Sequence, residues 1–529
     1  MTTLTEAGTA VDEPAGAARP AGTTRDPVVT AVHLRPARRH GMEARFAPTD
    51  PVAGWDVARH PKVARLLRNR RFQFLLILPN QIVFWAVILL GLLGTVVPGL
   101  NFGTAITWYL WFCLVFVMMV VVGRAWCAMC PFGGFGEWVQ RRALWQRTQK
   151  VLGLGRKLPE PIAQYGFLLS VGSFLVLTWI EETFNIAGPG APHATSWMVV
   201  GIVASALVFF LAFERRTFCR YVCPLSALIG TVGAMGSVAG FRTRDRDVCV
   251  ACETKECMRG SSSGYSCPWY TWPGSADSNL ACGLCTECYK SCPSDNIGLF
   301  LQKPMTSVVA PTRRRFDVAW AVAVLWGLVV YQQLNATNVY GTVDNWLNTT
   351  LHLRYPDPVD YVGIIGLVAL VMGGAAWVVQ RALARRDVVF PSGGTSYLER
   401  TSRFRAFFVP LMYGLIPVVG ADYFARQLPK FFQHVPRLVP SVGAWFGAGS
   451  THSTLYRYHL LADPRIVLVQ VLVIALGTLG AVSTSWRISG RDLAGISSRP
   501  LAVRLVAVGL ALACGVAAGV LYVVMHAAP

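Results

Sequence analysis

Residues 104–131 read TAITWYLWFCLVFVMMVVVGRAWCAMCP, an apolar run that is uncharged as far as Arg124 and ends in a pair of cysteines. The run 104–123 is long enough for a helix to cross the hydrocarbon core of a membrane, which takes about 20 apolar residues. Runs of similar length recur along the chain. The sequence therefore predicts nine membrane-spanning helices, at 73–97, 104–123, 162–180, 195–213, 317–334, 361–380, 405–424, 466–486 and 503–525.

The composition agrees with a multi-pass, all-α membrane protein. The chain is 53% hydrophobic and only 14% charged, whereas soluble domains carry about 25% charged residues. Its 48 Lys and Arg residues against 28 Asp and Glu give a net charge of +20, and most of the basic residues lie in segments that the nine spans put on one side. Basic loops stay in the cytoplasm. We therefore expect an inner-membrane protein with a cytoplasmic N-terminus and an external C-terminus, and no nucleic-acid partner.

The spans divide the chain into four parts. The apolar segment 225–240 has 16 residues and four glycines, so it predicts a buried or interfacial helix rather than a tenth span. The external segment 425–463 is aromatic and proline-rich, which predicts a loop along the membrane surface. The expected parts are a disordered basic cytoplasmic tail at 1–71, spans one to four at 72–244, a cytoplasmic α+β insert at 245–301 and spans five to nine at 302–529.

The insert holds eight of the 14 cysteines, and its second half reads C-x2-C-x2-C-x3-C-P from Cys282 to Pro293. This run is typical of bacterial ferredoxins that hold two [4Fe–4S] clusters. Three cysteines of one half bind one cluster, and the cysteine before the proline binds the other cluster. The spacing predicts a first cluster on Cys249, Cys252, Cys257 and Cys292, and a second on Cys282, Cys285, Cys288 and Cys267.

Two other uses of these cysteines are weaker hypotheses. Pairs of the form C-x2-C also make zinc ribbons, but ribbons separate two such pairs by a longer spacer, and neither half of the insert has that layout. Disulfides are disfavoured because the cytoplasm is reducing.

Four more cysteines lie just after spans two and four, as Cys127 and Cys130 in WCAMCP and Cys219 and Cys223 in FCRYVCP. Both pairs emerge on the predicted cytoplasmic side, and the arginines beside them should favour thiolates. The pairs could bind a third cluster or another metal, act as redox thiols, or only form structural turns, and the sequence leaves these alternatives open. Inside spans, Cys113 and Cys514 are expected to be buried packing residues.

These motifs together resemble the membrane polyferredoxins, a family of 4Fe-4S membrane proteins that includes NapH, NosR and CcoG. The membrane iron–sulfur protein FesM is similar. The resemblance covers about residues 73–301 and rests on WCAMCP, FCRYVCP and the ferredoxin insert. It implies an electron carrier that exchanges electrons with the quinone pool or a membrane redox enzyme. The first pair is one residue shorter than the family's usual C-x3-C-P.

Other cofactors and functions find little support in the sequence. There is no C-x2-C-H for covalent haem, the spans lack histidine pairs for b-type haem, and no acceptor for covalent flavin is present. The span centres carry essentially no charge, which disfavours a pump. Two external histidines, His452 and His459, could bind a metal or a quinone headgroup but are more simply solvated.

The leading hypothesis is electron transfer between a soluble cytoplasmic donor and the quinone pool or a membrane partner. The chain would be a component of an oxidoreductase system rather than a stand-alone enzyme. The alternative is a redox factor that reduces a metal, or senses redox state, during the maturation of another enzyme. A third hypothesis gives the insert only a docking role.

Overall fold

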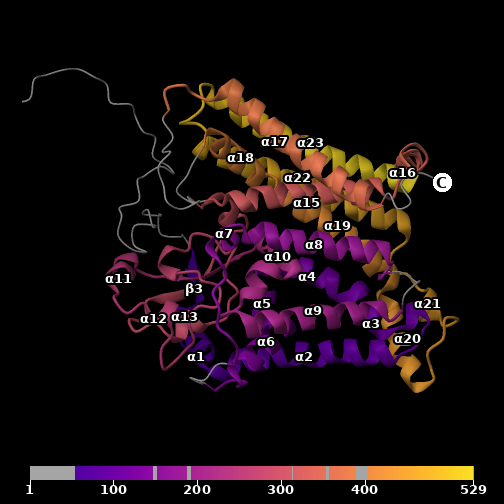
Figure 1. The fold of residues 1–529 in the computed structure, drawn as a ribbon, viewed down its shortest axis with the longest axis horizontal. Helices are drawn as coiled ribbons and strands as arrows, with labels where there is room; N and C mark the ends of the chain where they lie inside the picture. The colour runs from indigo at the N-terminus through magenta and orange to yellow at the C-terminus, as the bar shows by residue number, and fades with distance from the viewer. Residues whose placement is uncertain are drawn as a thin grey trace, which may run out of the picture.

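The computed structural model describes residues 54–146, 152–187, 192–311, 314–352, 357–388 and 402–527. Long helices run side by side, and a small domain with the only sheet of the described residues lies at one end of them (Figure 1). We call this the insert end, and the opposite end of the helices the far end. The first 53 residues of the predicted tail lie outside the described residues.

Eight helices are long and apolar enough to cross a membrane, and a bent pair makes a ninth candidate. This agrees with the predicted nine spans. The second span is built from three consecutive pieces, the middle one π-helical. The spans are α2 (Arg70–Leu93), α3 with η4 and α4 (Phe102–Thr104, Ala105–Trp111, Phe112–Val122), α8 (Gly166–Thr183), α9 (Ala194–Ala212), α15 (Phe316–Leu334), α17 (Asp357–Leu383), the pair α18 and α19 (Arg403–Gly414, Ile416–His434), α22 (Asp463–Asp492) and α23 (Pro500–Ala527).

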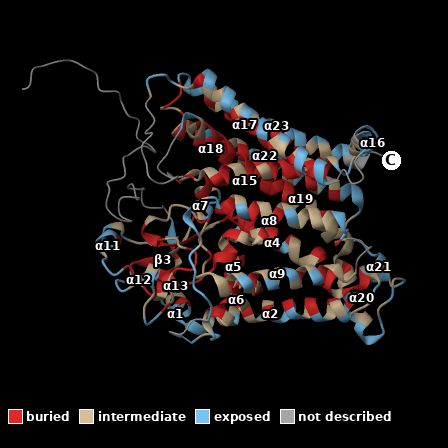
Figure 2. Ribbon diagram, viewed as in Figure 1, coloured by how far each residue is buried: buried red, intermediate tan, exposed pale blue. Residues whose placement is uncertain are grey.

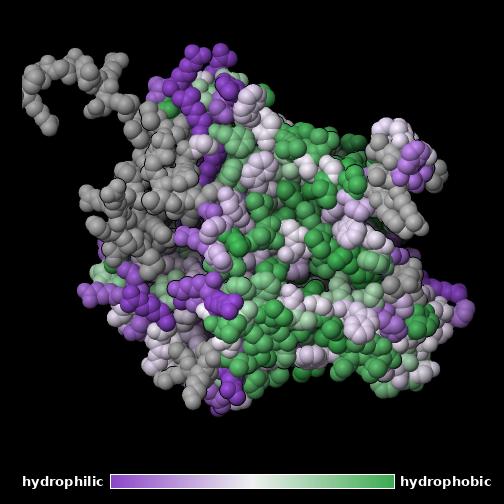
Figure 3. Space-filling view, viewed as in Figure 1, coloured by the Kyte–Doolittle hydropathy of each residue, from purple (hydrophilic) through white to green (hydrophobic). Residues whose placement is uncertain are grey.

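The helices form two groups, which α15 and α19 join. Helix α15 contacts α8 of the first group and α17, α18 and α19 of the second, and most of its side chains are buried. Buried residues gather along α15 and α18, whereas α17 and α23 are largely exposed (Figure 2). A hydrophobic band covers the sides of the helices, with hydrophilic residues toward the two ends (Figure 3). Exposed apolar side chains in a continuous band indicate contact with lipid, and the fold is that of a multi-pass membrane protein.

Short helices follow the second and fourth spans at the insert end. Two of them, α6 and α10, begin with a proline, a residue suited to the first turn because it lacks the N–H that would be unpaired there. Helix α10 is the buried short helix predicted within 225–240, although it is shorter than predicted and ends at Gly233. These short helices are α5 (Trp126–Met129), α6 (Pro131–Arg141), α7 (Glu160–Ala163), η5 (Phe218–Val222) and α10 (Pro224–Gly233).

The insert is larger than predicted because chain segments on both sides of the cysteines pair as strands. Strand β3 (Ile297–Leu301) lies between β2 (Val238–Thr243) and β1 (Trp55–Asp56) and is antiparallel to both, with Thr243 opposite Ile297. Residues predicted as tail are therefore ordered from Gly54. The helices of this small domain are η2 (Val57–Arg59), α1 (Pro61–Arg68), α11 (Arg246–Ala251), α12 (Glu256–Arg259), η6 (Pro273–Ser275), α13 (Glu287–Lys290) and α14 (Thr306–Val309).

The far end differs from the predicted surface loop at 425–463. Helix α19 continues to His434, so the first ten residues of that segment are helical and pack among the spans. Four short helices follow α19 at this end: η7 (Val435–Arg437), α20 (Leu438–Gly443), η8 (Ala444–Phe446) and α21 (Thr454–Arg457). Two helices from earlier in the chain lie at the same end, η3 (Pro98–Leu100) and α16 (Asn338–Leu351).

Candidate functional site

The two halves of the insert repeat one local structure around their third cysteines. Cys257 is the second residue of the four-residue helix α12, and Cys288 is the second residue of α13. Each helix follows a non-glycine residue in the left-handed conformation, Lys255 at φ 44° and Thr286 at φ 63°. Such backbone is sparsely populated and costs about 1–3 kcal/mol unless its surroundings hold it. The two extra residues before Cys257 therefore leave its role equivalent to that of Cys288.

The four cysteines predicted for the first cluster lie around one small cavity of about 20 Å³, lined by Cys249, Cys252, Cys257 and Cys292. Asn296 lies against two of these sulfurs. Its backbone N–H donates to Cys292 Sγ at 3.3 Å, and its side-chain amide donates to Cys249 Sγ at 3.4 Å. Burial and the neighbouring thiols raise the pKa of Cys257 to about 12. We call these four residues the first cysteine set.

The four cysteines predicted for the second cluster are also neighbours. Burial, reinforced by the thiols of Cys267, Cys285 and Cys282, raises the pKa of Cys288 well above that of a free thiol. Burial and the thiol of Cys267 likewise raise the pKa of Cys285. Four crowded thiols that resist ionisation become thiolates when a positively charged metal group binds them. We call Cys267, Cys282, Cys285 and Cys288 the second cysteine set.

The first and second sets adjoin each other. The backbone N–H of Cys267 donates to the carbonyl of Cys257 at 3.1 Å. Helix α12, which carries Cys257, packs against α13, which carries Cys288. These two thiols, one from each half of the insert, therefore lie within electrostatic reach of each other.

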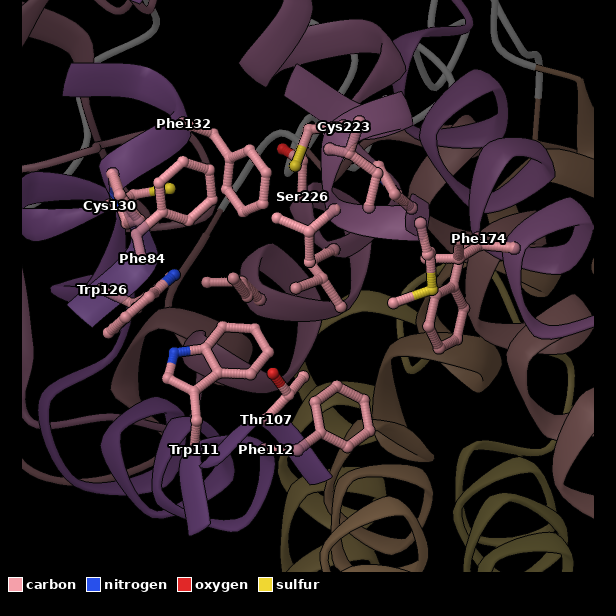
Figure 4. Close-up of a pocket in the computed structure, with 18 of the residues that line it drawn as sticks. Phe84, Thr107, Trp111, Phe112, Trp126, Cys130, Phe132, Phe174, Cys223 and Ser226 are labelled. Atoms are coloured by element: carbon pink, nitrogen blue, oxygen red, sulfur yellow. The ribbon is translucent and has the colours of Figure 1, made fainter. Parts of the chain in front are cut away.

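The third cysteine set comprises Cys127, Cys130, Cys219 and Cys223, which line one cavity of about 190 Å³ among the spans. Cys130 and Cys223 each directly precede the proline that begins a helix, α6 and α10 respectively. Figure 4 shows these two cysteines toward one side of the cavity, with Thr107, Trp111 and Phe112 on the opposite side. The fold therefore brings together the two cysteine pairs that the sequence separates by about ninety residues.

Burial opposes ionisation of the thiols of the third set. Burial raises the pKa of Cys130 to about 11 and that of Cys223 to about 12. Reactive thiols need a lowered pKa. As predicted, the arginines beside the third set favour thiolates, since Arg124 and Arg216 lower these pKa values, but burial outweighs them in the cysteines without metal. Two further arginines point to the insert instead, because Arg215 donates to the carbonyls of Cys267 and Met258 and stacks, like Arg220, on Tyr270.

Arg216 stands between the second and third sets. Its side chain is 1% exposed, and it donates to the carbonyl of Cys127 at 2.9 Å and to Glu137 Oε2 at 2.8 Å. The thiols of Cys219 and Cys285, one from each set, both lie within its electrostatic reach. One buried guanidinium thus faces two groups of sulfur.

Buried donors without a hydrogen-bond partner surround these sulfurs. They include Nε of Arg216, Nε1 of Trp269 and Oγ1 of Thr286. Trp269 packs with Cys219, Cys267 and Cys285 and also lines the cavity of the third set. An unpaired buried donor is costly, and [4Fe–4S] clusters accept hydrogen bonds at their sulfurs. Sets of four thiols, with unpaired hydrogen-bond donors beside them, are suited to bind anionic iron–sulfur clusters.

The remaining cysteines stand apart. All 14 are free thiols, and Cys113 and Cys514 are buried in apolar surroundings, as predicted for packing residues.

Among the described residues, no group of His, Cys, Asp or Glu has the close spacing of a single-metal site. A tetrahedral zinc with bonds of about 2.3 Å draws its ligands tightly together, whereas a cluster of four irons and four sulfides needs more room.

The cavity of the third set extends to polar residues at the far end, which the sequence did not indicate. Glu181 and Gln332 line it there, with Arg426, Gln427 and Lys430 of α19. Only the continuation of α19 past the predicted end of the seventh span brings these basic residues to the cavity. The two external histidines are not part of it. His452 contacts Arg457 at 3.1 Å, and both histidines are exposed.

Comparison with known proteins supports iron–sulfur binding at the third set. The family model of a 4Fe-4S binding domain matches residues 104–151 and 195–239. These segments contain Cys127, Cys130, Cys219 and Cys223, and exclude all eight cysteines of the insert. No curated protein and no solved structure matches the chain. The chain is an iron–sulfur protein with several apolar helices suited to a membrane.

Proposed function

We propose that the protein transfers electrons between a soluble cytoplasmic partner and the quinone pool, or a redox partner in the membrane, through three [4Fe–4S] clusters. The three cysteine sets would hold one cluster each. A bound cluster gains or loses one electron at a time. The observation that carries the proposal is that all four cysteines of the third set line a cavity among the spans, next to the second set.

The order of the three sets supports a path for electrons. The first set adjoins the second through Cys257 and Cys267, and Arg216 and Trp269 lie between the second set and the third. This chain of contacts leads from the insert to the cavity among the spans.

The outer station is the first set. Cys252 is partly exposed, and helices α11 and α12 lie at the edge of the molecule (Figure 1). The basic loops favour the cytoplasm for this end of the protein. A soluble protein that docks there would exchange electrons with the first cluster.

The inner station is the third set, where the cavity suits a quinone. Aromatic rings of Trp111, Trp126 and Phe132 line it beside the cysteines, and its wall is mostly apolar. Ligand sites are concave and mainly apolar with a few placed polar groups. A quinone ring held against these side chains would lie next to the thiolate ligands of the third cluster.

The proposal is tested by electron transfer to a quinone. Anaerobic protein reduced with dithionite and freed of excess reductant is mixed with a decyl-substituted benzoquinone, and the EPR signal of the reduced clusters is followed. We expect the quinone to reoxidise the clusters of the wild type, and a Cys223→Ser variant to keep the signals of the insert while losing fast reoxidation. Clusters that stay reduced in the wild type would contradict quinone as the partner.

A further inference from the structure

A single carboxylate lines the cavity of the third set. Among the described residues in its wall, Glu181 is the only acidic side chain, and there is no histidine. The other titratable groups are the four cysteines, Tyr423, two arginines and Lys430. The cysteines are committed as ligands under the proposed function, and arginine and tyrosine hold their protons near neutral pH. This leaves Glu181 and Lys430 as the groups in the wall that can pass a proton between water and the cavity.

The surroundings of Glu181 hold its side chain in place. Its side chain is 17% exposed, and its Oε1 lies 3.7 Å from Nζ of Lys430 on α19. Lys430 is also held 4.9 Å from the ring of Trp108. The next residue, Glu182, pairs with Arg426 at 3.5 Å and accepts a hydrogen bond of 2.8 Å from Gln332 of α15. Tyr361 of α17 also lies within electrostatic reach of both carboxylates.

Glu181 and the cysteines occupy opposite ends of the cavity. Glu181 is near the last residue of α8, at the far end, whereas Cys127 and Cys223 lie at the insert end. Trp108, which lies beside Lys430, belongs to the second span, and this span ends at Val122 toward the insert end. The 14 residues between them place Trp108 about 20 Å from that end at 1.5 Å per residue. The cavity thus connects an electron site with a proton site across much of the bundle.

We propose that Glu181, assisted by Lys430, exchanges the protons of a quinone in this cavity with the water at the far end. This inference rests on the proposed function. Reduction of a quinone to its hydroquinone takes two electrons and two protons. The electrons arrive one at a time from the third set. The protons arrive one at a time from the far end: the Glu181 carboxylate takes each proton from the water there and releases it into the cavity toward the quinone. Oxidation of a hydroquinone reverses every step.

The consequence is that the reaction moves charge across the membrane. Electrons enter the cavity from the insert end and protons enter it from the far end, so each turnover separates charge without a proton crossing the whole bilayer. This differs from a pump, which needs ionisable groups along its full path.

The side of proton uptake tests the inference. Full-length protein is placed in vesicles with a trapped pH-sensitive dye, valinomycin and potassium, and the same decyl-substituted benzoquinone. External dithionite, which crosses membranes poorly, supplies electrons to the chains whose insert faces outward. We expect the interior to become alkaline by about two protons for each quinone reduced, after subtraction of protein-free vesicles. Uptake from the external medium would overturn the inference.

Variants separate this inference from the proposed function. Glu181→Gln, which is nearly isosteric, should slow quinone reduction roughly 100-fold, a typical loss for a positioned proton donor. Its clusters should still show wild-type EPR signals after dithionite. Asp463→Asn removes an exposed carboxylate at the same end, outside the cavity wall, and should behave as wild type. Wild-type rates in Glu181→Gln would overturn the role of Glu181 alone, and no quinone reduction by the wild type would overturn both proposals.

Discussion

Arg216 and Glu137 form an ion pair of 2.8 Å whose side chains are 1% and 4% exposed. Arg216 follows the fourth span and Glu137 belongs to α6, which follows the second span. The pair therefore clamps together the two chain segments that carry the third cysteine set. The same guanidinium reaches toward Cys285 of the insert, so one buried pair links the membrane helices to the second set.

Breaking this pair should destabilise the protein. Arg216→Gln leaves the buried carboxylate of Glu137 with only Arg141, 3.0 Å away, and removing one partner of a buried pair costs about 3 kcal/mol. The thermal unfolding midpoint of the purified protein should fall by several degrees. Arg259→Gln, at an exposed arginine of the insert, should leave it unchanged. Equal midpoints for both variants would show that the pair contributes no stability.

Removing one ligand of the second set should remove one cluster. Cys285→Ser is expected to lower the iron content by about four per chain, because a [4Fe–4S] cluster needs its four ligands. The spans should still insert, since their packing does not depend on that thiol. Cys514→Ser, at a buried cysteine remote from the sets, should keep all the iron. If the variant disappears from the membrane, the spans depend on the cluster.

Removing one ligand of the third set should also remove one cluster, and electron exchange with quinone is then measured beside the iron content. Cys127→Ser and Cys223→Ser should each remove about four irons and abolish electron exchange with quinone. The EPR signals of the two clusters in the insert should persist. Wild-type iron content in both variants would leave these cysteines as structural turns.

Trp269 should tune a reduction potential. Its buried Nε1 has no hydrogen-bond partner and its ring packs with cysteines of the second and third sets. A donor to a cluster sulfur stabilises the more negative reduced form. Trp269→Phe should therefore lower one midpoint potential by about 40 mV, which corresponds to a hydrogen bond of about 1 kcal/mol. Trp138→Phe, which packs on Phe74, is the control for a redox titration. Unchanged potentials in both variants would exclude the donor role.

Stability without iron should fall at alkaline pH. Burial raises the pKa of Cys130 to about 11 and of Cys223 to about 12, whereas an unfolded thiol ionises near pH 8.5. The folded chain keeps protons that the unfolded chain loses, so this stabilisation is complete below about pH 8.5 and declines as the pH rises toward 11. Unfolding midpoints of iron-free protein should fall over this range. The protein with its iron should fall less, because its thiolates are already bound.

The spans and the three cysteine sets were predictable, because each rests on a local pattern. Apolar runs gave eight helices and a bent ninth near their expected positions, and the spacing of the insert cysteines gave the two groups that the structure brings together. The distant pairs at Cys127 and Cys219 could only be joined by assuming that two spans end at equal depth.

The rest depended on contacts between distant segments. Strand β1 uses Trp55 from the supposed tail to pair with β3, whose Leu301 lies about 245 residues later, and no local pattern indicates this pairing. Helix α19 continues through Arg426 and Lys430 because Glu181 and Glu182 of α8 face them. Asp422, buried in the same helix and bonded to Gln333, corrects the expectation of spans without charge.

The most direct test of the three-cluster account is the metal content of anaerobically purified protein, with an EPR spectrum after dithionite reduction. Three [4Fe–4S] clusters predict about twelve irons and twelve sulfides per chain, without zinc, and interacting signals from neighbouring clusters. About eight irons would contradict a cluster at the third set. Zinc in place of iron would contradict the electron-transfer account as a whole.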